Sequence, residues 1–430
     1  LLAVSAVSAA DNATSDVVSV EETTGEVVSA DENQVILSEN NDVGTFDDLQ
    51  IEIDNATEGS VLNLTRDYNG AYGSRIQLNK NLTIDGQGHT LDCLGKDGCS
   101  AFDSNSGTIT LKNLIIINGH NDFNNKGGAI YIEGSAQYTI INCTFSNNWA
   151  DDYGGAIYNG VDKPLTIINS SFDKNTADDD NGGAIYSKGD LDIINSTFTS
   201  NNADDDGGAI YCEKSIYLEN SLFEKNKAKV DGGAIYSKNN VTVTKNTRFY
   251  SNNATGATSA QCYGGAIRSE GNVKVEGSSF NDNIAGDYGG AIYAKSASIS
   301  SARFERNKAD DNYGGAVYVE DSVDVMSTTF SSNHAGDHGG AIYSKNRIFA
   351  KNTRFTSNYA RHKGSSVRCE GDVIIEDCYS AYNWAYNQGS IAAAGDIYIK
   401  NSEFRKDEVT NFGAAVYGEK NIYVDNGYFS

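Results

Sequence analysis

Clusters of aspartate recur along the sequence, each just before a Gly-Gly pair, and they are the first candidates for chemistry. If successive copies stack at the roughly 5 Å spacing of neighbouring strands, their carboxylates repel one another unless cations lie between them. Because oxygen clusters suit Ca²⁺, a calcium row is one prediction, and calcium is the only cofactor that the sequence suggests. The alternative, which we favour, is a solvated acidic loop, since the nonapeptide of calcium β-rolls is absent. The row would comprise Asp179, Asp180, Asp205, Asp206 and Asp231.

A tyrosine recurs as the last residue of the pentapeptide GGAIY, in the same register as the aspartates. Because strand side chains alternate, we expect the isoleucine to point into the core, and its alanine and tyrosine neighbours to point outward. Outward aromatic rings could stack on sugars or contact a protein, whereas packing within the sheet is the alternative. In two copies an arginine replaces the tyrosine, and Arg268, which separates two runs of tyrosines, would add a hydrogen-bonding fork for carboxylated sugars. The predicted binding row is Tyr186, Tyr211, Tyr236, Arg268, Tyr293, Tyr318 and Tyr343.

Signals of catalysis are few. Acids are too abundant for any pair to be specific, and the one marked insertion, residues 254–262, carries no acid or base. Because we find no nucleophile triad and no phosphate loop, we expect a protein that is not an enzyme. The alternative is a polysaccharide lyase or glycoside hydrolase with a cleft at that insertion or near Arg75 and His89. Three histidines in neighbouring copies could meet a metal ion, although incidental surface positions are expected: His334, His338 and His362.

The elements that position these residues come from a repeat of about 25 residues. Six of the eight steps between GGAIY variants after Gly182 are 25 residues long, and a second motif, Phe-x-x-Asn, keeps pace with them. No copy has helical periodicity or room for a helix of ten residues. We therefore expect three short strands per copy, stacked copy on copy, which makes an all-β right-handed parallel β-helix solenoid.

One copy shows the predicted core and a predicted ladder. Leu191, Ile193 and Phe198 should fill the interior of their coil together with Ile185. The asparagine of Phe-x-x-Asn, such as Asn201, should stack on its equivalents. We expect this ladder to be structural, because Asn tolerates left-handed backbone geometry and stacked amides hydrogen-bond along the axis.

The sequence divides into four predicted segments. Residues 1–10 form an apolar run that closes on small residues, typical of the end of a secretory signal. Residues 11–42 should be a disordered acidic linker. Residues 43–126 should be a cap and the first irregular coils, with a short amphipathic helix around 46–56 covering the apolar end. Residues 127–430 are the regular repeats, and the last stops within a copy, which suggests a fragment of a longer protein.

Composition restricts the partners and the compartment. A formal net charge of −25 speaks against nucleic acid and anionic membrane surfaces as partners. The sequence has no apolar run long enough to span a membrane. Seven cysteines in an exported chain suggest disulfides, and we favour Cys93 with Cys99 because they flank a short loop that contains glycine.

The paired GGA[IV] and Phe-x-x-Asn motifs resemble the repeats of chlamydial polymorphic outer-membrane proteins, over about residues 127–429. The acidic leader and the segments TFDDLQ and LTIDGQGHTLD are similar to those of adhesin-like surface proteins of methanogenic archaea. The resemblance implies the pectin-lyase-like β-helix superfamily and a secreted, extracellular protein of the cell surface. It also implies an adhesin-like role, although not a particular ligand. From the tyrosine row we expect glycans or surface proteins of other cells as partners, bound without catalysis.

Overall fold

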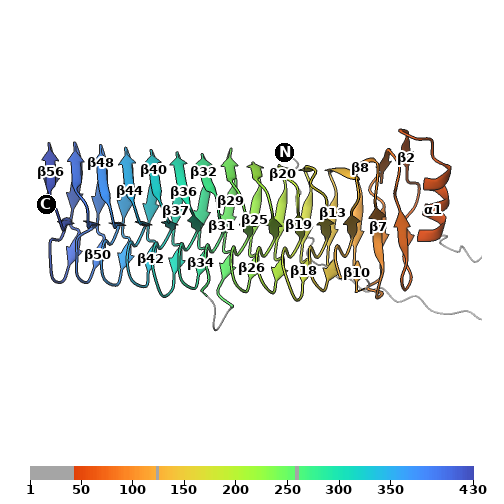
Figure 1. Cartoon of the computed structure of the whole chain (residues 1–430), viewed down its shortest axis with the longest axis horizontal. Helices are drawn as coiled ribbons and strands as arrows, with labels where there is room; N and C mark the ends of the chain where they lie inside the picture. The colour runs from red at the N-terminus through yellow and green to blue at the C-terminus, as the bar shows by residue number, and fades with distance from the viewer. Residues whose placement is uncertain (1–42, 123–124, 257–260) are drawn as a thin grey trace, which may run out of the picture. The chain divides into compact units, whose positions relative to one another are not determined.

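The computed structural model describes residues 43–122, 125–256 and 261–430. These residues form a right-handed parallel β-helix whose coils succeed one another along a single axis (Figure 1). The predicted signal and linker, residues 1–10 and 11–42, lie outside the described residues. Within the described part no helix is long and apolar enough to cross a membrane.

The predicted cap helix is present as α1 (Phe46–Asn55) at the beginning of the solenoid (Figure 1). Thr45 caps it, because its hydroxyl accepts from the Asp48 amide while the Asp48 carboxylate accepts from the Thr45 amide. The helix turns Phe46, Leu49 and Ile53 toward the first coils, where all three are buried. The helix therefore shields the apolar end of the solenoid from water.

Four parallel sheets run along the solenoid, so the prediction of three strands per copy is wrong. The described strands number 14, 15, 16 and 12 in the sheets that follow one another around a coil, named here C, B, A and D. The fourth strand of a coil spans two residues, too few to show alternation in the sequence. In one coil the four strands are β19 (Ile185–Ser187), β20 (Leu191–Ile194), β21 (Thr197–Thr199) and β22 (Asn202–Ala203).

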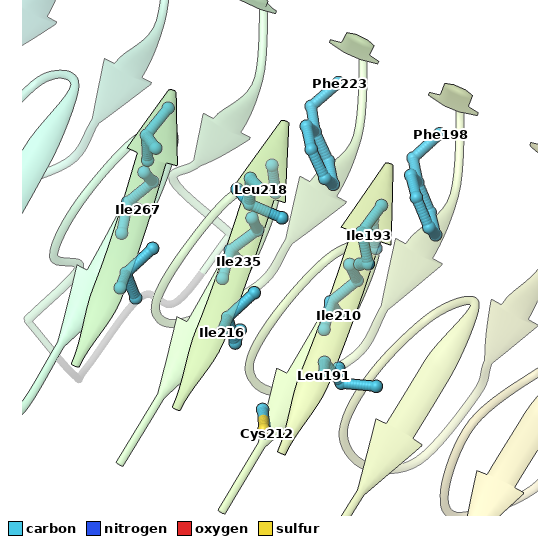
Figure 2. Close-up of a cluster of buried hydrophobic side chains, with 14 of the residues drawn as sticks. Leu191, Ile193, Phe198, Ile210, Cys212, Ile216, Leu218, Phe223, Ile235 and Ile267 are labelled. Carbon is cyan, nitrogen blue, oxygen red and sulfur yellow. The ribbon is translucent and has the colours of Figure 1, made fainter. Parts of the chain in front are cut away.

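The interior is filled as predicted by Leu191, Ile193 and Phe198, which point into the coil in Figure 2. Phenylalanines of neighbouring coils stack face to face, with the ring centroids of Phe198 and Phe223 4.9 Å apart. The predicted outward direction of the GGAIY alanine is wrong, since Ala184 is fully buried in the same core. The alternation of inward and outward side chains applies only within a strand, and Ala184 lies in the bend just before β19 begins.

The asparagine ladder is confirmed as a structural feature. Asn201 Nδ2 donates to Asn226 Oδ1 over 2.9 Å and to the Phe172 carbonyl over 3.1 Å, and every described member is buried. The left-handed backbone lies one residue earlier than predicted, at Ser200, with φ 56°. The ladder asparagine is therefore selected for its amide alone, and several residue types occupy the left-handed position before it.

Candidate functional site

The predicted tyrosine row is a buried column, so its expected exposure is wrong. The six tyrosines are only 3–8 % exposed, and the rings of Tyr186 and Tyr211 stack at 5.1 Å with nearly parallel planes. The column lies on the outer side of sheet C, apart from the main core, and loop tyrosines such as Tyr153 and Tyr313 pack over it. The ring faces are thus unavailable to a sugar. The six residues are Tyr186, Tyr211, Tyr236, Tyr293, Tyr318 and Tyr343.

The hydroxyl groups of this column also have partners. Tyr186 Oη donates to Glu213 over 2.5 Å, and Tyr293 Oη donates to Glu320 over 2.6 Å. Burial, and then the hydrogen bond to Glu213, raises the pKa of Tyr186 far above its ordinary value. Packing within the sheet, the alternative in the sequence interpretation, is therefore what the structure shows; a binding role of these rings stays a prediction.

Arg268 fills the gap in the column rather than presenting a fork to solvent. Its guanidinium lies over the Tyr293 ring, 4.3 Å from the centroid, and its side chain is 16 % exposed. Nε is 3.6 Å from Asp231 Oδ2, and Nη1 donates to the Ser269 carbonyl over 2.8 Å. Cation–π and ion-pair contacts occupy this group, so it is poorly placed to bind a carboxylated sugar.

The predicted acidic row is graded from exposed to buried. Asp179 is exposed, Asp180 and Asp205 are half-buried, and Asp231 is 8 % exposed. Burial, and then repulsion from Asp231, raises the pKa of Asp206 to about 8. Burial raises the pKa of Asp231 to about 7, opposed by the Tyr263 amide and by Arg268. These raised pKa values show that the hydrogen bonds and positive charges around Asp206 and Asp231 do not offset the cost of burying their negative charges.

No three of these five described aspartates bring their oxygens within 4.8 Å of one another. A Ca²⁺ ion bound by several of them would therefore require side-chain rearrangement. A calcium role for the row stays a prediction.

A different group does converge, and it includes two of the three histidines. Among the described residues, Asp337, His338 and His362 alone form a group of three whose ligand atoms lie within 4.8 Å of one another. His338 Nδ1 is 3.0 Å from Asp337 Oδ1, and His362 Nδ1 contacts the same oxygen. Although burial opposes it, contacts with His338 and His362 hold the pKa of Asp337 below its ordinary value. His334 lies apart, against the Tyr359 ring.

The outer face of sheet D carries aromatic residues only near its two ends. Near the first end, His120 meets Trp149 edge to face. Near the other, His334 packs on Tyr359 of β46 (Tyr359–Ala360), which stacks on Trp384 of β50 (Trp384–Ala385) with ring centroids 5.0 Å apart. The paired residues between them are Thr176, Asn202, Lys227, Asn253, Ile284 and Lys308.

A concave pocket of about 320 Å³ adjoins this second aromatic group. Tyr386 is 47 % exposed, and Tyr359 and Trp384 are half-buried, so the pocket offers accessible aromatic surface. Carboxylates are absent from its described lining. We call it the Trp384 pocket; it is lined by Tyr359, Arg361, His362, Trp384 and Tyr386.

The loop beside this pocket is basic, where the equivalent loops of most earlier coils carry aspartate. The Arg361 amide donates to the Ala335 carbonyl just as the Asp204 amide donates to the carbonyl of Ala177. The segment Arg361-His362-Lys363 thus takes the place that Asp204, Asp205 and Asp206 hold in their coil. Arg361 is exposed and forms no ion pair with any residue that the structure describes. The local charge is therefore reversed in an otherwise acidic solenoid.

The residues of the enzyme alternative, Arg75 and His89, lie in separate contacts. Arg75 Nη2 donates to Asn121 Oδ1 over 2.8 Å, whereas His89 Nδ1 lies 3.0 Å from Asp67 Oδ1. Part of the 254–262 insertion, residues 257–260, lies outside the described residues. The enzyme alternative is not tested by these contacts.

Cys93 and Cys99 lie together as buried free thiols. The hydrogen bond with the Cys99 thiol, and then burial, raises the pKa of Cys93 well above its ordinary value. Their adjacency agrees with the predicted pair, and the disulfide itself stays a prediction.

Comparison with known protein families matches two parts of the chain. Residues 80–247 match the family described as right handed beta helix region. Residues 277–295 and 327–345 match the Chlamydia polymorphic membrane protein repeat. Searches of the curated proteins and of the solved structures gave no significant match. The resemblance to archaeal adhesin-like proteins stays a prediction. The chain is thus a right-handed parallel β-helix with repeats similar to those of chlamydial polymorphic membrane proteins.

Proposed function

We propose that this chain belongs to an exported, adhesin-like protein of the cell surface, which binds acidic glycans at the Trp384 pocket without cleaving them. The similarity of its repeats to those of Chlamydia polymorphic membrane proteins supports the surface location. The observation that carries the binding site is the combination of accessible aromatic rings with the exposed, unpaired Arg361 in one concavity of the described surface.

Each part of the pocket suits a sugar that bears a carboxylate or a sulfate. Tyr386 and Trp384 combine a large apolar surface with a polar edge, which matches the mixed faces of a pyranose ring. Arg361 can donate two parallel hydrogen bonds to a carboxylate. A volume of about 320 Å³ is at the lower end of ligand pockets, enough for one or two sugar units.

The overall charge of −25 does not exclude an acidic ligand. Charges are screened beyond about 8 Å at physiological ionic strength, so the nearest groups dominate. Arg361 lines this pocket, whereas the two carboxylates beside lining residues stand outside the lining: Asp337 contacts His362, and Glu408 pairs with Trp384. Binding should therefore tolerate moderate salt and weaken at very low salt, where distant aspartates repel the ligand.

Binding without turnover is supported by the composition of the pocket. Glycoside hydrolases ordinarily use a pair of Asp or Glu residues that flank the scissile bond. The described lining offers three aromatic residues, an arginine and a histidine, and no carboxylate. These groups can orient a sugar, but they do not supply the acid and base pair.

The test is an array of acidic and neutral glycans probed with the chain and with two matched double variants. Arg361→Gln/Tyr386→Ser changes the pocket, whereas Arg248→Gln/Tyr250→Ser makes the same substitutions at exposed positions of sheet A. We expect binding to carboxylated or sulfated glycans that falls at least tenfold, about 1.4 kcal/mol, in the pocket variant only. Equal binding by both variants, or binding to no glycan, would contradict the proposal.

A further inference from the structure

We propose that Asp337, His338 and His362 bind a divalent transition-metal ion of the Zn²⁺ class. This site shares His362 with the lining of the Trp384 pocket, but its ligand chemistry differs from that of glycan recognition and does not depend on it. Two imidazoles and one carboxylate favour Zn²⁺, Ni²⁺, Co²⁺ or Cu²⁺ over Ca²⁺ and Mg²⁺, which take oxygen ligands.

The three side chains are already near coordination geometry. Their ligand atoms lie within 4.8 Å of one another, and His338 Nδ1 is 3.0 Å from Asp337 Oδ1. With metal–ligand distances of roughly 2.0–2.2 Å, tetrahedral coordination places ligand atoms roughly 3.4 Å apart. Small changes of side-chain torsion would therefore admit an ion between them.

The solenoid register holds the ligands in place. The His362 amide donates to the Asp337 carbonyl over 2.9 Å, which sets these two residues in adjacent coils one above the other. The His338 ring stacks on Tyr313 with centroids 5.0 Å apart and planes inclined by 5°, which fixes its orientation. A site carried by hydrogen-bonded coils loses little conformational entropy when it binds an ion.

One of the proposed ligand atoms, His338 Nδ1, is buried without a well-aligned hydrogen-bond partner. His338 Nδ1 is buried and lies 3.0 Å from Asp337 Oδ1, but this contact lacks the angles of a good hydrogen bond. Buried polar atoms are normally hydrogen-bonded, so an orphaned ring nitrogen beside a carboxylate needs an explanation. A metal ion would satisfy it and would also neutralise Asp337.

Among the described coils, the combination of one aspartate and two histidines occurs only in the adjacent pair that carries Asp337, His338 and His362. Two and one coils earlier, the positions of Asp337 and His338 are held by Asp287 with Tyr288 and by Asn312 with Tyr313. Those coils cannot supply two imidazoles to one ion. The equivalence of Asp287 with Asp337 offers a matched control that carries the carboxylate without the histidines.

Metal binding is measured on the whole chain after treatment with a chelator. We expect isothermal titration to show one Zn²⁺ site of micromolar or tighter affinity that a hundredfold excess of Ca²⁺ does not displace. Zn²⁺ should also raise the thermal midpoint, and Co²⁺ should give visible absorption bands characteristic of a protein site. His362 is 43 % exposed, so His362→Gln should fold normally and still lower the affinity at least tenfold.

The controls are His334→Gln, which removes a nearby histidine outside the cluster, and Asp287→Asn. Both should bind Zn²⁺ as the unchanged chain does. The proposal is overturned if the unchanged chain shows no Zn²⁺ site, or if Asp337→Asn/His338→Gln/His362→Gln binds with the same affinity. Because the readouts are affinity, thermal midpoint and absorption, failure here leaves glycan binding untouched.

Discussion

At the scale of single residues, Asp206 and Asp231 show how the fold perturbs its own acidic loops. The Asp231 amide donates to Asp206 Oδ1 over 3.1 Å, and Arg268 lies 3.6 Å from Asp231 Oδ2. These contacts do not compensate fully for burial, because the pKa values of Asp206 and Asp231 rise to about 8 and about 7. At neutral pH the Asp206 side chain therefore favours the protonated form in the folded chain, whereas Asp231 is about half protonated.

This imbalance predicts a dependence of stability on pH. An unfolded aspartate titrates near pH ~3.9, so the folded chain holds the Asp206 proton more tightly than the unfolded chain does. The resulting stabilisation is present below about pH 4 and is lost as pH rises through about 8. Asp206→Asn keeps an oxygen acceptor for Asp231 and removes the charge. We expect it to stabilise the chain by roughly 1–2 kcal/mol at pH 8.5, and little at pH 4.

Thermal melts at several pH values test this, with Asp179→Asn as the control at an exposed position of the same row. The control should change the midpoint little at any pH. An Asp206→Asn variant whose midpoint parallels that of the unchanged chain from pH 4 to 8.5 would show that Asp206 is well hydrated.

At the scale of elements, the asparagine ladder ties each coil to the next. The Asn226 side chain donates to the Phe198 carbonyl over 2.9 Å and to Asn252 Oδ1 over 3.0 Å. Its own oxygen accepts from the Asn201 backbone and side-chain amides. The Asn226 side chain thus forms hydrogen bonds with buried polar groups of the preceding and following coils, and removing it would leave several of these groups without partners.

Asn226→Ala should therefore destabilise the chain by roughly 3–5 kcal/mol, because several buried polar groups lose their hydrogen bonds. Asn202→Ala, at a half-buried position on sheet D, is the control and should cost about 1 kcal/mol or less. Equilibrium unfolding in urea compares the two. Equal destabilisation by both substitutions would argue against a special role of the ladder.

The sequence predicted correctly those features that depend on motif spacing or on the residue pattern of one short segment. The spacing gave the repeat length, and local patterns gave the interior position of Ile185 and Phe198 and the cap helix α1. The burial of Tyr186 could not be predicted from alternation, because it depends on loops that fold back over sheet C. Likewise Ala184 lies in a bend, where alternation does not apply.

The residues of the two candidate sites could have been brought together from the sequence by counting 25 residues from one coil to the next. Trp384 follows Tyr359 by 25 residues, Tyr386 follows Arg361 by 25, and His362 follows Asp337 by 25. Stacked coils place such pairs side by side, so the substitution of Arg-His-Lys for the usual acids was the signal to follow. The inward or outward direction of each side chain still required the coordinates.

At the scale of the whole solenoid, four continuous sheets carry a mostly acidic surface with one local reversal of charge. Each strand pairs only with its equivalents in the adjacent coils, so stability is distributed along the axis and a loop can vary without altering distant coils. This arrangement explains how one loop can carry Arg361 and His362 in a scaffold that otherwise repeats. The proposed binding function therefore lies in the variable loop beside sheet D, whereas the stacked asparagines and aromatic residues stabilise the scaffold.

The most direct test is a calorimetric titration of the chain with the best acidic oligosaccharide from the array, followed by mass spectrometry of the recovered ligand. We expect saturable binding at one site, loss of that heat in Arg361→Gln/Tyr386→Ser, and an oligosaccharide of unchanged mass after prolonged incubation. Shortened products or unsaturated ends, or equal heat from the pocket variant, would contradict the claim that this solenoid binds acidic glycans at the Trp384 pocket without cleaving them.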